Sequence, residues 1–202
     1  MIRSVLFIKL LVFLLLSLTF KAMAYEEATY SIVYQNNIYE IRNYSERLAI
    51  QVNYTNEGGG FRRLFNYISG SNIDSTKINM TTPVTQSTKI SMIAPVTQSS
   101  EDGVKVMQFF LPSNFTKKNA PAPTDKELKL IIMEQGYYAV IKYSGRLTDK
   151  NYDKRRKILK DSILKDNIEI LSSSIRATYN GPFTLPFLRR NEVMFLVAWK
   201  DK

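Results

Sequence analysis

The stretch MTTPVTQS at 80–87 is followed, after a gap of four residues, by MIAPVTQS at 92–99, and six of the eight paired positions are identical. A period of twelve is shorter than the roughly 20–50 residues of a solenoid repeat, but it suits two successive β-strands. Proline cannot donate to a strand ladder, so we expect Pro83 and Pro95 at strand ends, edges or bulges, with a polar Thr-Gln-Ser turn after each strand. Two strands bent at the same point predict a sheet curved around a cavity, and a plain hairpin is the other interpretation.

The N-terminal residues 1–24 have the pattern of a secretory signal peptide. Two basic residues precede an apolar run over 10–20, and an A-x-A cleavage site follows at 22–24. This run is shorter than the roughly 20 residues that span a bilayer. We therefore expect export with cleavage after Ala24, no stable membrane anchor afterwards, and a mature chain over 25–202 in the periplasm or secreted.

The charge balance is basic but scattered. The chain has 28 Lys and Arg against 18 Asp and Glu, a net charge of +10, and removal of residues 1–24 takes away three basic residues and no acid, which leaves +7. The one dense basic run, at 154–157, falls on a predicted helix and is interpreted as a solvated face, with affinity for anionic lipid headgroups as the alternative. An exported protein meets no nucleic acid, so no nucleic-acid partner is expected.

The chain contains no cysteine and no histidine. It is therefore not a disulfide scaffold, and its core must come from aliphatic and aromatic residues. The lack of histidine excludes Ser-His-Asp and Cys-His nucleophile systems, zinc sites built on imidazole, and His-ligated haem. No metal site is predicted.

Hydrophobic periodicity divides the chain into two similar halves, at about 30–118 and 126–200. In the first half we expect strands at 38–44 and 48–54, a break at the three glycines 58–60, a helix at 61–70, the two repeat strands, and a strand at 104–111. In the second half we expect strands at 128–133 and 138–143, a helix at about 150–165 capped by Thr148 or Asp149, and strands at 176–179 and 191–199. The prediction is an α+β fold in a single domain over 25–202: a distorted antiparallel β-barrel from two similar strand-helix-strand halves, flanked by two helices.

An ordered set of motifs resembles the SOUL haem-binding protein family. The motifs are YE at 39–40, FRRLFNYISGSN at 61–72, the paired MTTPV and MIAPV, FFLPSNF at 109–115, APAPTD at 120–125, YSG at 143–145 and PFLRRNEVMF at 186–195. The resemblance extends from about Tyr30 to Trp199. It implies a distorted β-barrel of two halves flanked by two helices, with haem or another tetrapyrrole as a ligand that is held non-covalently.

The resemblance also implies where the tetrapyrrole would bind, in an apolar groove between the first helix and the loop before the last strand. The matching and neighbouring positions are Phe61, Arg62, Leu64, Phe65, Ile68, Leu185, Phe187, Arg189 and Arg190. Apolar residues would hold the macrocycle and arginines its carboxylates. In the alternative interpretation, the phenylalanines only pack the helix onto the sheet and the arginines pair with Glu40 or Glu192.

Axial ligands to a haem iron, if any, would be tyrosines or the thioethers of Met80, Met92, Met107 and Met194. The leading hypothesis is an exported haem or tetrapyrrole carrier, buffer or sensor without catalysis. One alternative is an interaction module of the same fold that binds a partner protein, and another is a small hydrolase that uses Glu40 or Glu192.

Overall fold

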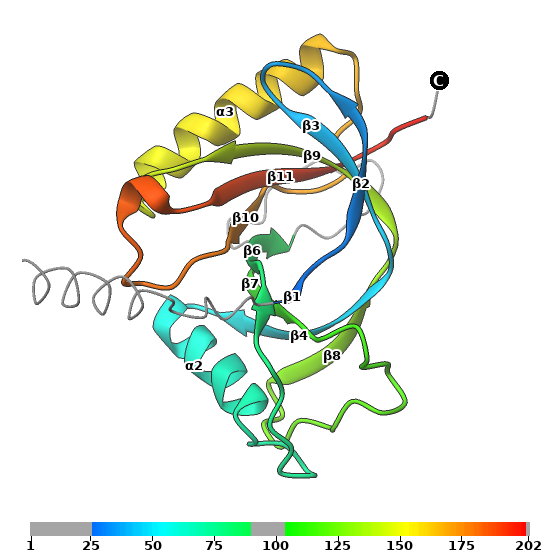
Figure 1. Ribbon diagram of the computed structural model, residues 1–202, viewed down its shortest axis with the longest axis vertical. Coiled ribbons are helices and arrows are strands. Elements are labelled where there is room, and N and C mark those ends of the chain that lie inside the picture. Colours follow the sequence, from blue (N-terminus) through cyan, green and yellow to red (C-terminus); the bar gives the residue numbers. More distant parts are fainter. Residues whose placement is uncertain (1–25, 90–103, 201–202) are drawn as a thin grey trace, which may run out of the picture.

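A curled nine-stranded antiparallel sheet forms the body of the protein, and two helices pack against its outer face (Figure 1). The computed structural model describes residues 26–89 and 104–200. The predicted α+β fold with a barrel-like antiparallel sheet and two flanking helices is confirmed. Within the described residues, no helix is long and apolar enough to cross a membrane.

The strand order of the sheet is nearly symmetric about its middle. The strands are β1 (Glu26–Glu27), β2 (Tyr30–Gln35), β3 (Glu40–Tyr44), β4 (Arg47–Tyr54), β5 (Thr81–Thr82), β6 (Val84–Lys89), β7 (Val104–Phe110), β8 (Leu128–Met133), β9 (Gly136–Tyr143), β10 (Ile175–Thr178) and β11 (Asn191–Val197). The large sheet runs β2-β3-β9-β11-β10-β6-β7-β4-β8, and β1 pairs with β5 in a separate parallel ladder. The order β8-β4-β7-β6 on one side thus mirrors β3-β9-β11-β10 on the other.

The two halves exchange their first strands. In the first half, β3 pairs with β9 of the second half and sets Ile41 opposite Ala139. In return, β8 pairs with β4 and sets Leu130 opposite Ile50. The halves also share the central β6–β10 ladder, so they form one continuous sheet rather than two separate layers.

The helix α3 (Asp149–Lys165) agrees with the prediction, and Thr148 caps it by accepting a hydrogen bond from the backbone N–H of Asn151 at 3.3 Å. The helix α2 (Glu57–Ile68) begins four residues earlier than predicted. Asn56 is the N-cap, and the glycines 58–60 form the first turn instead of a break. A Cβ at Gly60 would lie 3.0 Å from the Cβ of Tyr54, so glycine lets this turn pack closely against the end of β4.

The first copy of the repeat forms a strand interrupted by proline. Pro83 separates β5 from β6, as expected for a residue that cannot donate to the ladder. The predicted Thr-Gln-Ser turn is wrong for this copy, because 85–87 lie inside β6, where Thr85 donates to the Gln108 side chain at 3.1 Å. A polar interior network therefore replaces the turn. The second copy, at 92–99, lies outside the described residues.

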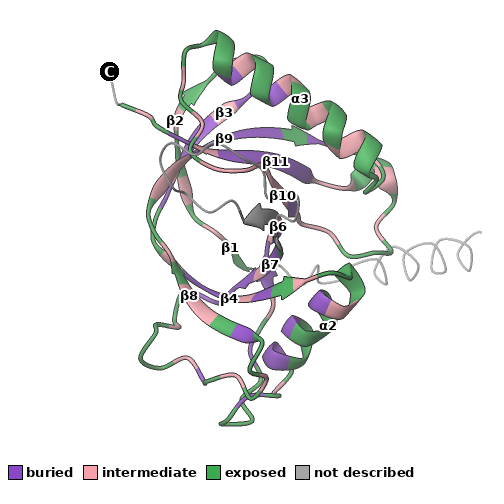
Figure 2. Ribbon diagram, turned by 180° about the vertical axis from the view of Figure 1, so that it is seen from behind, coloured by how far each residue is buried: buried purple, intermediate pink, exposed green. Residues whose placement is uncertain are grey.

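Successive side chains of a strand point to opposite faces of the curled sheet. One set forms two cores under the helices, on the outer face, and the other set points into the interior that the curled sheet encloses. The buried face of α2 packs on β4 and β7, the buried face of α3 packs on β3, β9 and β11, and both faces are visible in Figure 2. A third cluster inside the curl contains Tyr44, Tyr138, Val140, Ala177 and Met194. The outer side of β6 and β10 lies between the two helices, and this position defines the candidate site.

Candidate functional site: an apolar groove with a polar extension

An apolar groove of about 530 Å³ lies beside α2, over the outer side of β6, β7 and β10. Its apolar walls come from Phe61, Met80, Val84, Met107, Leu147 and Pro182. Because side chains alternate along a strand, Val84 and Gln86 of β6 face the groove while Thr85 between them faces the interior of the curl. Arg176 and Thr178 of β10 face the groove in the same way, on either side of buried Ala177.

Phe61 forms the wall on the helix side. Its ring is stacked on that of Phe65 at 6.1 Å between centroids and meets buried Phe109 edge-on at 5.2 Å. Phe61 and Phe65 still remain 40% and 47% exposed. Phe61 therefore packs the helix onto the sheet and also presents an aromatic surface to the groove.

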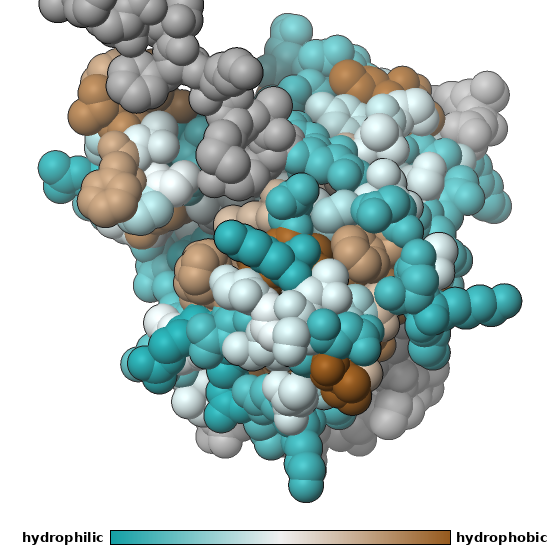
Figure 3. Space-filling model, turned by 60° about the horizontal axis from the view of Figure 1, so that its bottom comes forward, coloured by the Kyte–Doolittle hydropathy of each residue, from teal (hydrophilic) through white to brown (hydrophobic). Residues whose placement is uncertain are grey.

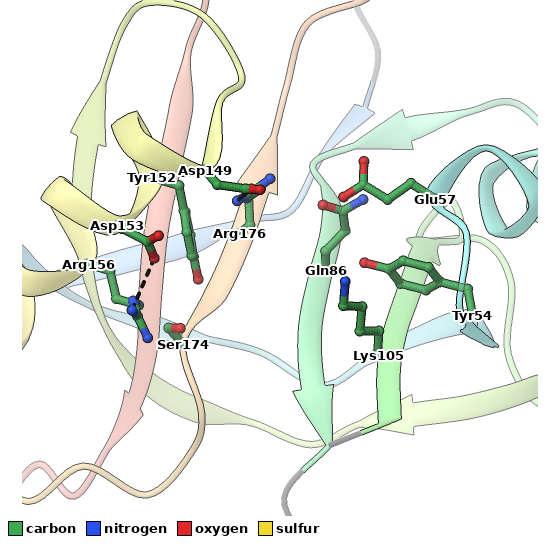
Figure 4. A pocket seen from close by; sticks show the side chains of 10 residues that line it. All are labelled: Tyr54, Glu57, Gln86, Lys105, Asp149, Tyr152, Asp153, Arg156, Ser174 and Arg176. Atoms are coloured by element: carbon green, nitrogen blue, oxygen red, sulfur yellow. Dashed lines mark hydrogen bonds and ion pairs between the residues drawn. The ribbon is translucent and has the colours of Figure 1, made fainter. Parts of the chain in front are cut away.

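A polar cleft of about 280 Å³ continues the groove toward α3 and shares Glu57, Gln86 and Arg176 with it. Figure 4 shows this cleft, with Tyr152, Asp153 and Arg156 of α3 facing Tyr54 and Lys105 across it. The combined site thus has one apolar end and one charged end, which is an arrangement suited to an amphipathic ligand.

Arg176 lies where the groove and the cleft meet. Its guanidinium stacks on the ring of Tyr152 at 4.2 Å and pairs with Asp149 at 2.6 Å. Burial alone would lower the pKa of Arg176, but the hydrogen bond to Asp149 and the charge of that carboxylate, together with nearby tyrosines, outweigh burial and raise it. The same bond lowers the pKa of the Asp149 carboxyl. Arg176 therefore stays charged, in a fixed orientation, next to an apolar surface.

The structure distributes the helix residues of the predicted site over three environments. Phe61 lines the groove and Phe65 is stacked next to it. Leu64 and Ile68 are buried in the core beneath α2, and Arg62 is exposed on the helix. The aromatic part of the predicted helix face thus lies at the groove, while its aliphatic part holds the helix on the sheet.

The loop segment that borders the groove is 179–182, and the predicted loop residues, which follow it in the chain, are not among the residues that line the groove. Leu185 and Phe187 are exposed around a short 3₁₀ turn, Pro186–Leu188. Arg189 donates to the backbone oxygens of Pro182 at 2.7 Å and of Thr184 at 2.8 Å, so it shapes the loop. Arg190 pairs with Glu27 at 2.8 Å and with Glu192 at 3.0 Å.

Sequence reasoning missed several residues of the site, chiefly Val84, Leu147 and Arg176. The alternation of apolar and polar residues in 175–178 was the available signal for Arg176, since a polar residue there must face away from the core. Among the thioether candidates, Met80 and Met107 line the groove, whereas Met194 lies inside the curl. Met92 falls outside the described residues.

The carboxylates Glu40 and Glu192 belong to a buried ionic cluster inside the curl. Glu192 accepts from both terminal nitrogens of Arg42 at 3.0 and 3.2 Å and from the Tyr179 hydroxyl at 2.7 Å. Glu40 accepts from Arg42 at 2.8 Å and from Lys142 at 3.0 Å. Burial alone would raise the pKa of Glu40, but the hydrogen bonds and the positive charges of Arg42 and Lys142 together outweigh burial and lower it. The cations therefore hold the Glu40 carboxylate ionised, which does not suit a general acid, and the oxygens of Glu192 are already engaged by Arg42 and Tyr179.

Tyr179 contributes its ring to the groove, but its hydroxyl is committed to Glu192. Burial and the charge of Glu192 raise the pKa of Tyr179 far above its usual range. Its phenol is therefore kept protonated, and Met80 and Met107 are the candidate axial ligands that the groove itself offers.

Comparison with known proteins agrees with this fold. The C-terminal domain of EcmrR matches with a TM-score of 0.55 at 9% identity, over 79% of this chain and 98% of that chain. A hydrolase from Listeria innocua matches with a TM-score of 0.55 at 10% identity, over 82% of this chain and 94% of that chain. At such identities the likeness shows the fold alone, and no curated protein matches in sequence.

The family model described as "SOUL heme-binding protein" matches residues 25–196. This match covers both halves, both helices, every described strand of the large sheet except the last residue of β11, and every described residue that lines the groove. The chain therefore belongs to the SOUL haem-binding protein family.

Proposed function

We propose that this protein binds haem or a related tetrapyrrole non-covalently in the groove beside α2, as a carrier, buffer or sensor rather than as an enzyme. The observation that carries the proposal is the groove itself, whose volume of about 530 Å³ and apolar walls suit a flat apolar ligand. Phe61, Met80 and Met107 would contact the macrocycle, and Arg176 is placed to pair with a carboxylate at its edge. Bound haem would supply the redox and ligand-binding chemistry of its iron.

The test is a spectrophotometric titration with hemin, with iron-free protoporphyrin IX as the comparison. We expect saturable one-to-one binding of both, because the groove offers a slot for the macrocycle and the chain contains no imidazole for the metal. Binding of hemin alone would mean that the iron is gripped, and binding of neither would refute the proposal.

Two variants locate the site. Phe61→Glu places a charge against the apolar wall and should abolish the change in the Soret band. Leu164→Glu on α3 is the matched control, because Leu164 is also exposed on a helix but lies outside the groove. If Phe61→Glu binds hemin as tightly as the control does, the groove is not the site.

We also propose that the protein is exported, with residues 1–24 removed as a signal peptide. The support is the charged and apolar pattern of this segment together with its A-x-A site. N-terminal sequencing of protein recovered from the periplasm or the medium should start at Tyr25. Recovery of the full chain from membranes would contradict cleavage.

A role as an interaction module that binds a partner protein is the second candidate, and the loop between β10 and β11 favours it. Phe183 and Phe187 on this loop are 98% and 71% exposed, and apolar side chains gather there at the upper left of Figure 3. Under this alternative, affinity capture would recover one stoichiometric partner, and Phe183→Ser would release it without changing hemin binding.

A further inference from the structure

Three arginines reach the interior of the curled sheet, and two of them have acidic partners among the described residues. Arg42 is fully buried and its nitrogens are matched by Glu40, Glu192 and the Tyr44 hydroxyl. Arg190 pairs with Glu27 and Glu192, and its Nη2 atom is buried without a hydrogen-bond partner among the described residues. Arg47, at the start of β4, makes no ion pair with any described residue.

The guanidinium of Arg47 is held between two aromatic rings. It lies 3.9 Å from the ring centroid of Phe110 and 4.8 Å from that of Tyr44. Its Nε and Nη1 atoms are buried, and neither has a hydrogen-bond partner among the described residues. Burial lowers the pKa of Arg47, although nearby tyrosines act in the opposite direction. A buried cation without a counter-charge is destabilising, so this position calls for an anion or for water.

Arg47 stands between two cavities. An inner cavity of about 20 Å³, bordered by Thr85 and Gln108, has room for about one water molecule. An outer chamber of about 360 Å³ opens at the end of the curl. Arg47 and Phe110 border both spaces, so the Arg47 side chain lies between them.

The lining of the outer chamber defines the class of ligand that would fit. Its apolar walls are Ala28, Leu48, Phe110, Leu111 and Pro112, and Arg47 is the only cation among the described residues that line it. Glu26, Glu27 and Glu46 also border it, and their negative charge disfavours a ligand with more than one negative charge. Glu27 is neutralised by Arg190, and the carboxylate of Glu26 accepts from the backbone N–H of Ser113 at 2.8 Å.

We propose that this chamber is a second ligand site, separate from the groove beside α2, that binds a small amphipathic monocarboxylate with its carboxylate on Arg47. The apolar part of the ligand lies against Leu48, Phe110 and Pro112. The ligand supplies the negative charge that no described residue of the chain provides as an ion-pair partner of Arg47. None of the described residues that line the chamber lines the groove, so the two sites are spatially distinct.

Isothermal titration calorimetry with hexanoate, hexanamide and adipate tests the proposal on the purified protein. Hexanoate should bind one-to-one. Hexanamide should bind at least about tenfold more weakly because it makes no charge-assisted hydrogen bond to Arg47. Adipate should also bind at least about tenfold more weakly because its second carboxylate has no cation to pair with. Equal affinity for hexanoate and hexanamide, or no saturable binding of hexanoate in the millimolar range, would overturn the site. The latter result would leave water as the partner of Arg47.

Matched variants assign the binding to Arg47. Arg47→Met should weaken hexanoate binding at least about tenfold, and Arg146→Met, at an exposed arginine outside the chamber, should leave it unchanged. Arg47→Met replaces an unpaired buried charge with an apolar side chain, so its melting temperature should not fall. Glu46→Gln removes a rim carboxylate and should tighten hexanoate binding without touching Arg47. Unchanged affinity in Arg47→Met, or weaker binding in Glu46→Gln, would contradict the proposal.

Discussion

The helices α2 and α3 occupy equivalent places in the two halves, but their exposed faces differ. α3 carries seven Lys or Arg and three Asp, with an ion pair of 2.7 Å between Lys157 and Asp161. α2 carries one Glu and two Arg and exposes the stacked rings of Phe61 and Phe65. The apolar groove lies on the α2 side, and the polar cleft reaches the first turns of α3.

This difference shows that the duplicated backbone and the binding chemistry are separate properties of the chain. The repeated strand-helix-strand arrangement fixes two helices on either side of the central β6–β10 ladder. Which ligand can bind between them depends on a few side chains at the helix starts and on alternate positions of the central strands. Variants can therefore test the frame and the site separately.

The largest expected effect is on the stability of the sheet, at the strands through which the two halves pair with each other. Arg42 of β3 and Glu192 of β11 form a buried bidentate pair. Arg42→Met leaves the buried carboxylate with fewer partners and should lower the free energy of unfolding by about 3–5 kcal/mol. Urea unfolding of Lys142→Met provides the control, because that exposed partner of Glu40 should cost less than about 1 kcal/mol. Similar losses in both variants would show that the buried pair does not lock the halves together.

The sequence predicted the frame well because local periodicity carries that information. The strand at 128–133 and the helix at about 150–165 agree with β8 and α3, since alternation and i, i+3, i+4 spacing are visible in one segment. The start of α2 was missed because a run of glycines usually breaks structure, whereas here Gly60 allows close packing on Tyr54.

The lining of the site was harder to predict from the sequence. Met80, Leu147 and Arg176 meet in space only because β6 pairs with β10, and this register joins segments about ninety residues apart. The inside of the curl was hidden for the same reason. Nothing in the sequence next to Arg47 shows that it has no acidic partner among the described residues, because its neighbours depend on which strands close around it.

The second effect concerns the charged end of the groove. Arg176→Gln should weaken the binding of protoporphyrin IX about tenfold, because a charge-assisted contact to a carboxylate is lost. Binding of the dimethyl ester of the same porphyrin, which has no free carboxylate, should change little. Lys157→Gln on the exposed face of α3 is the control. Equal loss for the free acid and the ester would mean that Arg176 only shapes the groove, through its contact with Tyr152.

The third effect distinguishes the buried faces of the two helices by their response to pH. The Tyr67 hydroxyl of α2 donates to the Pro121 oxygen at 2.8 Å, whereas α3 buries Leu159 and Ile163, which have no titratable group. Burial raises the pKa of Tyr67 from 10.0 to about 12. The protonated Tyr67 hydroxyl therefore contributes fully to the free energy of unfolding below pH 10. This contribution is lost as the pH rises toward 12, because the tyrosine of the unfolded chain ionises first.

Tyr67→Phe should therefore cost about 2 kcal/mol at neutral pH, where it leaves the buried Pro121 oxygen without its partner. At a pH near 11 the difference from wild type should narrow by about 1.4 kcal/mol, since the variant has no hydroxyl to ionise. Chemical unfolding at both pH values measures this change. Tyr34→Phe, at a tyrosine that is 36% exposed, serves as the control. If the stability difference between Tyr67→Phe and wild type stays constant with pH, burial of the Tyr67 hydroxyl does not make stability depend on pH.

The smallest effect compares the two helix starts directly. Asn56 caps α2 by accepting from the backbone N–H of Gly59 at 3.2 Å, and Thr148 caps α3 in the same way. Either cap replaced by alanine should cost about 1 kcal/mol of stability. The consequence for binding should differ, because the first turns of α2 hold Glu57 and Phe61 against the groove, while its glycines give that turn little helix propensity of its own. Asn56→Ala should therefore weaken hemin binding several-fold more than Thr148→Ala does, and equal affinities would show that the groove does not depend on the order of this turn.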